Sequence, residues 1–161
     1  MKMPLSNFAT ASFSNDDENI YVAVWQQLML CSKPLEQEIS NRFRKQFNQS
    51  MVRYELLSQL EGGKWLSIGK VAQGLLSSNG NITKLVERMI TEDLLSRRKD
   101  PNDRRIIEIG LTEKGANLLS EMAKAHASWT QSLMSTQEVQ KEADQLQLLW
   151  QQVRHQHILP N

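Results

Sequence analysis

The stretch that decides the fold is L-L-S-R-R-K-D-P-N-D-R-R-I-I-E-I-G-L-T, residues 94–112. Leu94 to Arg98 and Ile106 to Leu111 both have the pattern of short strands, and the second alternates apolar with small or polar residues. Between them lies K-D-P-N-D-R, residues 99–104, which is typical of a turn because Pro, Asn and Asp favour turn conformations. The stretch therefore predicts a β-hairpin with cations at its tip.

Two short amphipathic helices precede this hairpin. Lys64 to Leu66 forms a brief extended segment, and Ser67 is placed to cap a helix that carries apolar residues as far as Leu76. Ser78 is placed to cap a second helix, whose apolar face is Ile82, Leu85, Val86, Met89 and Ile90. Two helices joined by a tight turn and followed by a hairpin predict a winged helix-turn-helix.

Longer helices flank the central module. Apolar positions recur at helical spacing from Asp17 to Phe47, and we expect a kink or break near Ser32 and Lys33 because Pro34 lacks an N–H. Ser50 is expected to cap a helix that Gly62 and Gly63 terminate. Further helices are predicted after Thr112 and after Ser135.

The sequence thus predicts a mainly α fold with a small β-wing. We assign residues 1–16 to a flexible arm, 50–111 to the winged helix-turn-helix, and 17–49 together with 112–161 to dimerisation helices. These outer helices have more apolar surface than the small module can cover, which favours a two-fold homodimer. The alternative is a monomer in which the helices fold back.

Composition limits the classes of function. The chain has 161 residues, 40% of them hydrophobic and 23% charged, and one cysteine. No run approaches the roughly 20 apolar residues of a membrane span, and the first 15 residues lack the apolar core of a signal peptide. One cysteine excludes an internal disulfide framework. We therefore expect a cytoplasmic protein with no membrane contact.

Charge is segregated along the chain. Residues 64–105 contain nine basic and five acidic side chains, whereas the whole chain carries a net charge of +1. A basic module on an acidic scaffold is typical of a protein that binds a polyanion, although a solvated charged loop would give the same count.

The partner that fits this module is double-stranded DNA. A helix fits the major groove, with polar residues near its amino end reaching base edges, and an arginine at a wing tip suits the narrow minor groove. Ser or Asn at a helix start is also the ordinary choice for a cap. The predicted DNA-binding residues are Ser77, Ser78, Asn79, Asn81, Thr83, Lys84, Arg88, Lys99, Asp103, Arg104 and Arg105.

From Ser67 to Gly115 the chain resembles the MarR (multiple-antibiotic-resistance regulator) family. That family has a D-P-x-D-R-R motif, an alternating strand and then L-T-x-x-G, and here Asp100 to Arg105 and Leu111 to Gly115 match it. Ile82 to Met89 is similar to the family's V-T-R-L-V-D-R-L. The resemblance implies a homodimer on a pseudo-palindromic operator, commonly a repressor released by a small ligand. Leu76-Ser77-Ser78 and Gly80 depart from the family's usual G-L-S turn, so no operator preference carries over.

Family members commonly bind aromatic anions, and by analogy the ligand candidates here are Trp25, Arg42 and Arg53. Each of the three also fits a structural role. Cys31 has the apolar spacing of an inert buried thiol, with redox sensing as the alternative. His126, His155 and His157 are scattered, so we expect no metal and no cofactor.

No catalytic constellation accompanies these features. The chain has no G-x-S-x-G motif, no phosphate loop and no cysteine and histidine with an orienting partner, so we expect no enzymatic activity. The rival to a regulator is a winged-helix module for protein contact or DNA architecture that recognises no specific operator.

Overall fold

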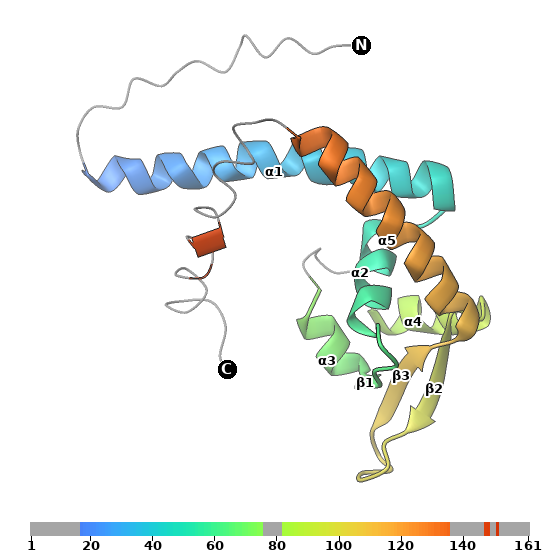
Figure 1. Cartoon of the computed structure of the whole chain (residues 1–161). Helices are drawn as coiled ribbons and strands as arrows, with labels where there is room; N and C mark the ends of the chain where they lie inside the picture. The colour runs from blue at the N-terminus through green and yellow to red at the C-terminus, as the bar shows by residue number, and fades with distance from the viewer. Residues whose placement is uncertain (1–16, 76–81, 136–146, 149–150, 152–161) are drawn as a thin grey trace. The chain divides into compact units, whose positions relative to one another are not determined.

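The computed structural model describes residues 17–75, 82–135, 147–148 and 151. The chain divides into two compact units, Met1–Glu38 and Ile39–Asn161, and each is described here by itself (Figure 1). Within the described ranges, no helix has both the length and the apolarity needed to cross a bilayer.

Helix α1, Asp17–Phe47, continues through Pro34, so of the kink or break expected near Ser32 and Lys33 the break was wrong. Proline removes one hydrogen bond from the helix, the one that the carbonyl of Leu30 would accept. Because Pro34 is exposed, water can reach that carbonyl instead. Within the first unit, Val22, Trp25, Leu28 and Leu30 are between 45% and 62% exposed, so this part of α1 presents apolar side chains to solvent.

The second unit starts with the end of α1, followed by α2, Met51–Gln59. The Ser50 side chain accepts a hydrogen bond from the backbone N–H of Arg53, so the expected cap is confirmed. Helix α2 ends at Gln59, and the predicted glycines, Gly62 and Gly63, follow in the loop after it. Both have a φ of +76°, a conformation that glycine adopts without strain.

The helix-turn-helix consists of α3, Ile68–Gln73, and α4, Ile82–Thr91. Ser67 caps α3 by accepting a hydrogen bond from the backbone N–H of Lys70, as expected. The cap predicted at Ser78 lies outside the described residues. Most of the helix predicted after Ser135 does too, but Gln147, Leu148 and Gln151 are described and are helical. Ser135 itself ends α5, Glu113–Met134.

The wing is a three-stranded antiparallel sheet in the order β1-β3-β2. Strands β2, Leu95–Lys99, and β3, Ile107–Leu111, lie within one residue of the predicted strands and extend beyond the helices as a ribbon (Figure 1). The extended segment expected at 64–66 becomes strand β1, Leu66–Ser67, and pairs with β3. This pairing was not foreseen, because two residues are too few to show an alternating pattern.

A single apolar cluster joins the helices of the winged helix to its sheet. Helices α2 to α5 and strands β2 and β3 each contribute at least one fully or almost fully buried side chain, whereas β1 contributes the partly buried Leu66. These side chains are Leu56, Leu57 and Leu60 from α2 and the residue that follows it, Val71, Val86, Met89, Leu94, Leu95, Ile109 and Leu119. Burial of this many aliphatic groups stabilises the module and fixes α4 against α3 and the sheet.

Helix α5 begins in direct contact with the backbone at the end of α4. Thr112 caps α5 by accepting a hydrogen bond from the N–H of Gly115, and its hydroxyl donates to the carbonyl of Asp93 at 2.7 Å. The N–H of Thr112 donates to the carbonyl of Leu94 at 3.2 Å. A Cβ on Gly115 would lie 2.0 Å from that same carbonyl oxygen. The approach is so close that only glycine fits.

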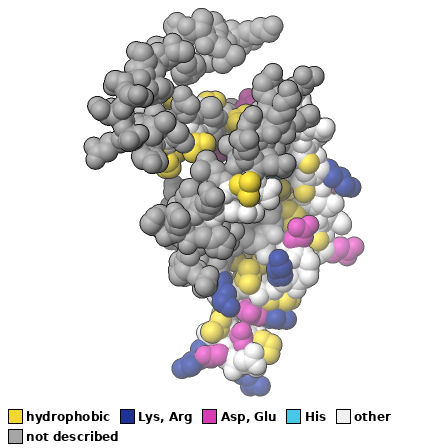
Figure 2. All heavy atoms as spheres, turned by 60° about the vertical axis from the view of Figure 1, so that its left-hand side comes forward, with side chains coloured by type: hydrophobic (Ala, Val, Ile, Leu, Met, Phe, Trp, Pro, Cys, Tyr) yellow, Lys and Arg dark blue, Asp and Glu magenta, His cyan; other side chains and the backbone are white. Residues whose placement is uncertain are grey.

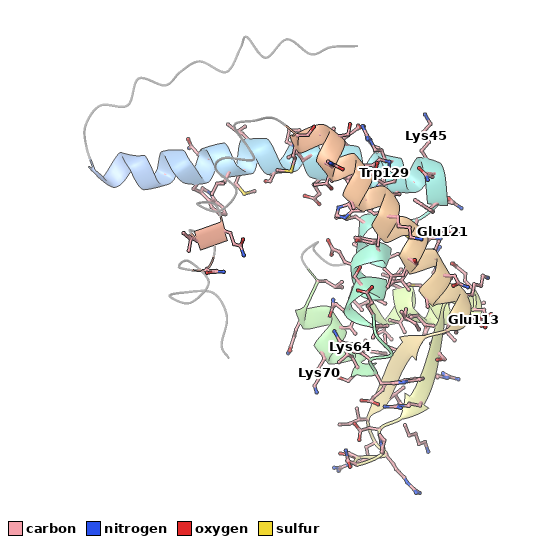
Figure 3. All side chains as sticks on the ribbon, viewed as in Figure 1. Lys45, Lys64, Lys70, Glu113, Glu121 and Trp129 are labelled. Atoms are coloured by element: carbon pink, nitrogen blue, oxygen red, sulfur yellow. The ribbon has the colours of Figure 1, made fainter. Side chains whose placement is uncertain are left out.

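A second, aromatic cluster lies where the end of α1 meets α2 and α5. Phe43 is fully buried and packs on Tyr54 at 4.8 Å and Trp129 at 5.2 Å between ring centroids. Figure 3 labels Trp129 on α5, close to the end of α1 that Lys45 marks. His126 stacks on Phe43, with ring centroids 5.8 Å apart, and its Nδ1 lies 3.4 Å from the Tyr54 hydroxyl. Burial lowers the pKa of His126 from its ordinary value.

We expect Gly115→Ala to destabilise the protein by on the order of 3 kcal/mol, because its methyl group would collide with the Leu94 carbonyl and the backbone would have to move. Gly69→Ala is the matched control, since a Cβ at this helical position meets nothing within 4 Å. Urea unfolding measures both. A Gly115 variant as stable as the Gly69 variant would contradict the close approach.

We expect stability to fall as the pH drops below 6.5, the ordinary pKa of histidine. The unfolded chain then takes up a proton that the folded chain, with its lowered His126 pKa, resists. His126→Phe keeps the aromatic packing and should remove this part of the pH dependence. Urea midpoints measured at pH 8 and pH 5.5 test it, and an equally large pH effect in the variant would count against this assignment.

Candidate nucleic-acid interface

The tip of the wing is a tightly hydrogen-bonded turn. The N–H of Asp100 donates to the carbonyl of Ile106, and the N–H of Ile106 donates to the carbonyl of Asp103, both at 2.9 Å. The Asp100 carboxylate also accepts from the N–H groups of Asn102 and Asp103, at 2.7 and 2.9 Å. These backbone bonds lower the pKa of Asp100. Two backbone hydrogen bonds and the Asp100 carboxylate therefore hold the turn in shape.

A second carboxylate orients an arginine on this turn. Asp103 accepts three hydrogen bonds from Arg105, one from the backbone N–H, one from Nε and one from Nη2, each at 3.0 Å. The side-chain bond to Arg105 lowers the pKa of Asp103 and raises that of Arg105. The Arg105 side chain is still 90% exposed. The guanidinium is thus held in one orientation while it projects into solvent.

The other cations of the wing lie on two different faces of strand β2, as its register against β3 requires. Arg98 lies opposite Glu108 and forms an ion pair with it at 2.9 Å, and its guanidinium lies 4.3 Å from the ring centroid of Trp65. Arg97 and Lys99 alternate with Arg98 along β2 and are exposed. They share the face of β2 that buries Leu95, because side chains two residues apart point to the same side of a strand.

Helix α4 separates its apolar from its polar residues. Val86 and Met89 are buried in the core, whereas Thr83, Lys84 and Arg88 are exposed. Lys84 and Arg88 are one turn apart and therefore lie on the same side. Together with Glu87, Thr91 and Glu92 they line a shallow hollow of about 530 Å³.

The structure brings part of the predicted interface together. Lys99, Asp103, Arg104 and Arg105 are all on the wing, and Figure 2 shows basic side chains, with acidic ones between them, around its tip. Ser77, Ser78, Asn79 and Asn81 lie outside the described residues. Arg97 is not among the predicted residues, but it is exposed on β2 and shares a face of the strand with Lys99.

The three ligand candidates occupy different surroundings. Trp25 is 62% exposed on the α1 segment of the first unit. In the second unit, the Arg42 guanidinium lies 6.0 Å from the ring centroid of Trp129. Arg53 is buried and forms an ion pair with Glu92. No group of metal-ligating side chains occurs among the residues that the structure describes.

Comparison with known proteins places the winged helix in a family. Residues 50–107 match the model of the MarR family. Over 66 residues the chain is 32% identical to the HTH-type transcriptional regulator MhqR of Bacillus subtilis (strain 168), an alignment that covers 41% of this chain and 46% of that protein. The chain spans about half to three fifths of the length of the curated relatives it matches.

Two solved structures share the fold at low identity. A mutant MarR of Escherichia coli, crystallised with operator DNA, matches with a TM-score of 0.68 and 17% identity, over 86% of this chain and 98% of that one. The organohalide-sensing regulator RdhR-CbdbA1625, in a 2,4-dichlorophenol-bound form, matches with a TM-score of 0.68 and 15% identity, over 91% and 88%. The family model, the homologous segment and the shared fold together identify residues 50–107 as a winged helix of the MarR family.

Proposed function

We propose that the protein is a sequence-specific DNA-binding transcriptional regulator. The observation that carries this proposal is Arg105, which is exposed at the wing tip yet fixed by Asp103 through two side-chain hydrogen bonds. An arginine held in one orientation on a projecting turn can enter a narrow minor groove with little loss of side-chain entropy. A solvated loop would not need a carboxylate to orient its cation.

In this proposal α4 lies in the major groove, with Thr83, Lys84 and Arg88 toward the DNA and its buried residues against the core. Arg97 and Lys99 then contact the sugar-phosphate backbone between the two grooves, because they lie on β2 between the core and the wing tip. The described part of the interface therefore combines base, groove and phosphate contacts. Ser77 to Asn81 remain predicted contacts at the start of the recognition helix.

We further propose that the regulator acts as a homodimer on a pseudo-palindromic operator. The apolar residues Val22, Trp25 and Leu28 recur at three-residue spacing on α1 and are about half exposed or more, so a second copy of the chain would remove them from water. Two copies related by a two-fold axis would present two recognition helices to two half-sites.

The regulator is proposed to be a repressor released by a small aromatic anion. Two observations support this: a structural neighbour was solved with 2,4-dichlorophenol bound, and Arg42 lies beside the aromatic cluster around Trp129. A guanidinium next to aromatic rings suits such a ligand. Trp25 and Arg53 stay predicted ligand residues.

We expect Arg105→Ala to weaken binding to a pseudo-palindromic operator by roughly ten- to hundredfold and to reduce the salt slope of binding by about one, while the protein stays folded. Lys45→Ala is the control, because it removes the same charge from an exposed position at the end of α1. Fluorescence anisotropy on specific and scrambled duplexes measures both. Equal affinity for the two duplexes would instead favour the architectural module, and unchanged binding by the Arg105 variant would reject the wing assignment.

We expect Trp25→Glu combined with Leu28→Glu to convert the dimer into a monomer, because two carboxylates would be buried at the proposed contact. Gln37→Glu is the control, since Gln37 is exposed on the same helix but faces away from Trp25 and Leu28. Sedimentation equilibrium gives the mass of each. A dimer that survives the double change would place the two-fold contact elsewhere.

A further inference from the structure

Arg53 is the one charged residue buried among the residues that the structure describes, at 9% exposure. It lies in the first turn of α2, and its Nη2 forms an ion pair with the carboxylate of Glu92. Its Nε is buried and has no hydrogen-bond partner among the described residues. Burying a guanidinium costs free energy unless an opposite charge compensates it. Here the carboxylate of Glu92 supplies that charge for Arg53.

Glu92 belongs to the stripe of α4 that carries its exposed cations. Its backbone N–H donates to the carbonyl of Arg88 at 2.9 Å, so helical spacing continues to Glu92 although α4 ends at Thr91. Lys84, Arg88 and Glu92 are therefore each four residues apart and lie on one side of the helix. The hollow that these side chains line agrees with this arrangement. A contact that holds the Glu92 side chain in place therefore also fixes the direction in which Arg88 and Lys84 point.

An unpaired acid at this place would oppose DNA binding in two ways. It would repel the phosphates that the stripe is proposed to approach. It would also lie at the carboxyl end of α4, where the helix dipole disfavours a negative charge. Asp93, which follows directly, adds a second acid at the same end. The ion pair with Arg53 supplies a positive charge that neutralises the carboxylate of Glu92.

We propose that Arg53 is a positioning residue of the DNA-binding site: it fixes the rotation of α4 about its axis through Glu92 and cancels the charge of that acid. This inference rests on the proposed function for its DNA-binding consequence, but the fixing of α4 concerns the free protein. Lys114 assists from α5, since its Nζ donates to the backbone carbonyl of Glu92 at 2.7 Å. That bond holds the backbone and leaves the carboxylate to Arg53.

Operator affinity tests the DNA-binding consequence. Arg53→Met should raise the operator Kd about tenfold, whereas Lys124→Met, which removes the same charge from an exposed position on α5, should change it less than twofold. Arg53→Met with Glu92→Met should recover most of the lost affinity, because both charges are gone. Recovery in the double variant would show that the loss in the single variant comes from the unpaired charge of Glu92 and not from the lost bulk of Arg53. Arg53→Met with wild-type affinity, or a double variant as weak as the single one, would overturn the proposal.

Hydrogen exchange of the free protein tests the positioning itself and needs no DNA. Glu92→Gln, which keeps the size of the side chain, should speed amide exchange in the last turn of α4, from Met89 to Thr91, relative to wild type. Unchanged exchange there would overturn the inference even if Arg53→Met fails to fold. If the wild-type protein binds no operator while exchange responds as expected, the proposed function fails and the positioning of α4 by Arg53 stands.

Discussion

The structure depends on the contact between the first turn of α5 and the backbone that follows α4. Gly115 allows this contact, Thr112 uses one hydroxyl to accept from Gly115 and to donate to Asp93, and the carbonyl of Leu94 receives the N–H of Thr112. The same three-residue segment, 92–94, is held from α2 by Arg53. Helices α2, α4 and α5 therefore converge on one short piece of chain, and strand β2 begins directly after it.

Backbone hydrogen bonds close the turn at this place. The N–H of Leu94 donates to the carbonyl of Met89 and that of Asp93 to the carbonyl of Ile90, which is the Schellman arrangement that ends a helix. Asp93 takes the left-handed conformation at φ 60°, where glycine would be easier. This conformation of Asp93 costs some backbone strain, and it lets β2 leave the end of α4 in the direction that pairing with β3 requires.

How much the sequence could predict follows from the range of each interaction. Several predictions that rest on local sequence patterns are confirmed. Ser50, Ser67 and Thr112 cap their helices, and the turn at 99–104 separates two strands. The break predicted at Pro34 was wrong. The sequence shows that Pro34 lacks an N–H, but it does not show that the helix is exposed there and that water can therefore reach the carbonyl left without a donor. Neither the pairing of β1 with β3 nor that of Arg53 with Glu92 could be foreseen, because each joins residues about 40 positions apart with no local pattern.

Trp65 gives the wing an optical property. The guanidinium of Arg98 lies 4.3 Å from the centre of the Trp65 ring, and a Cβ on Gly110 would lie 2.9 Å from the ring, so the ring packs between the Arg98 side chain and the backbone of β3. Indole emission responds to a nearby cation and to local polarity, and here both depend on the register of β2 against β3. The residue is therefore a built-in spectroscopic probe of wing geometry, readable without a label once the other tryptophans are replaced.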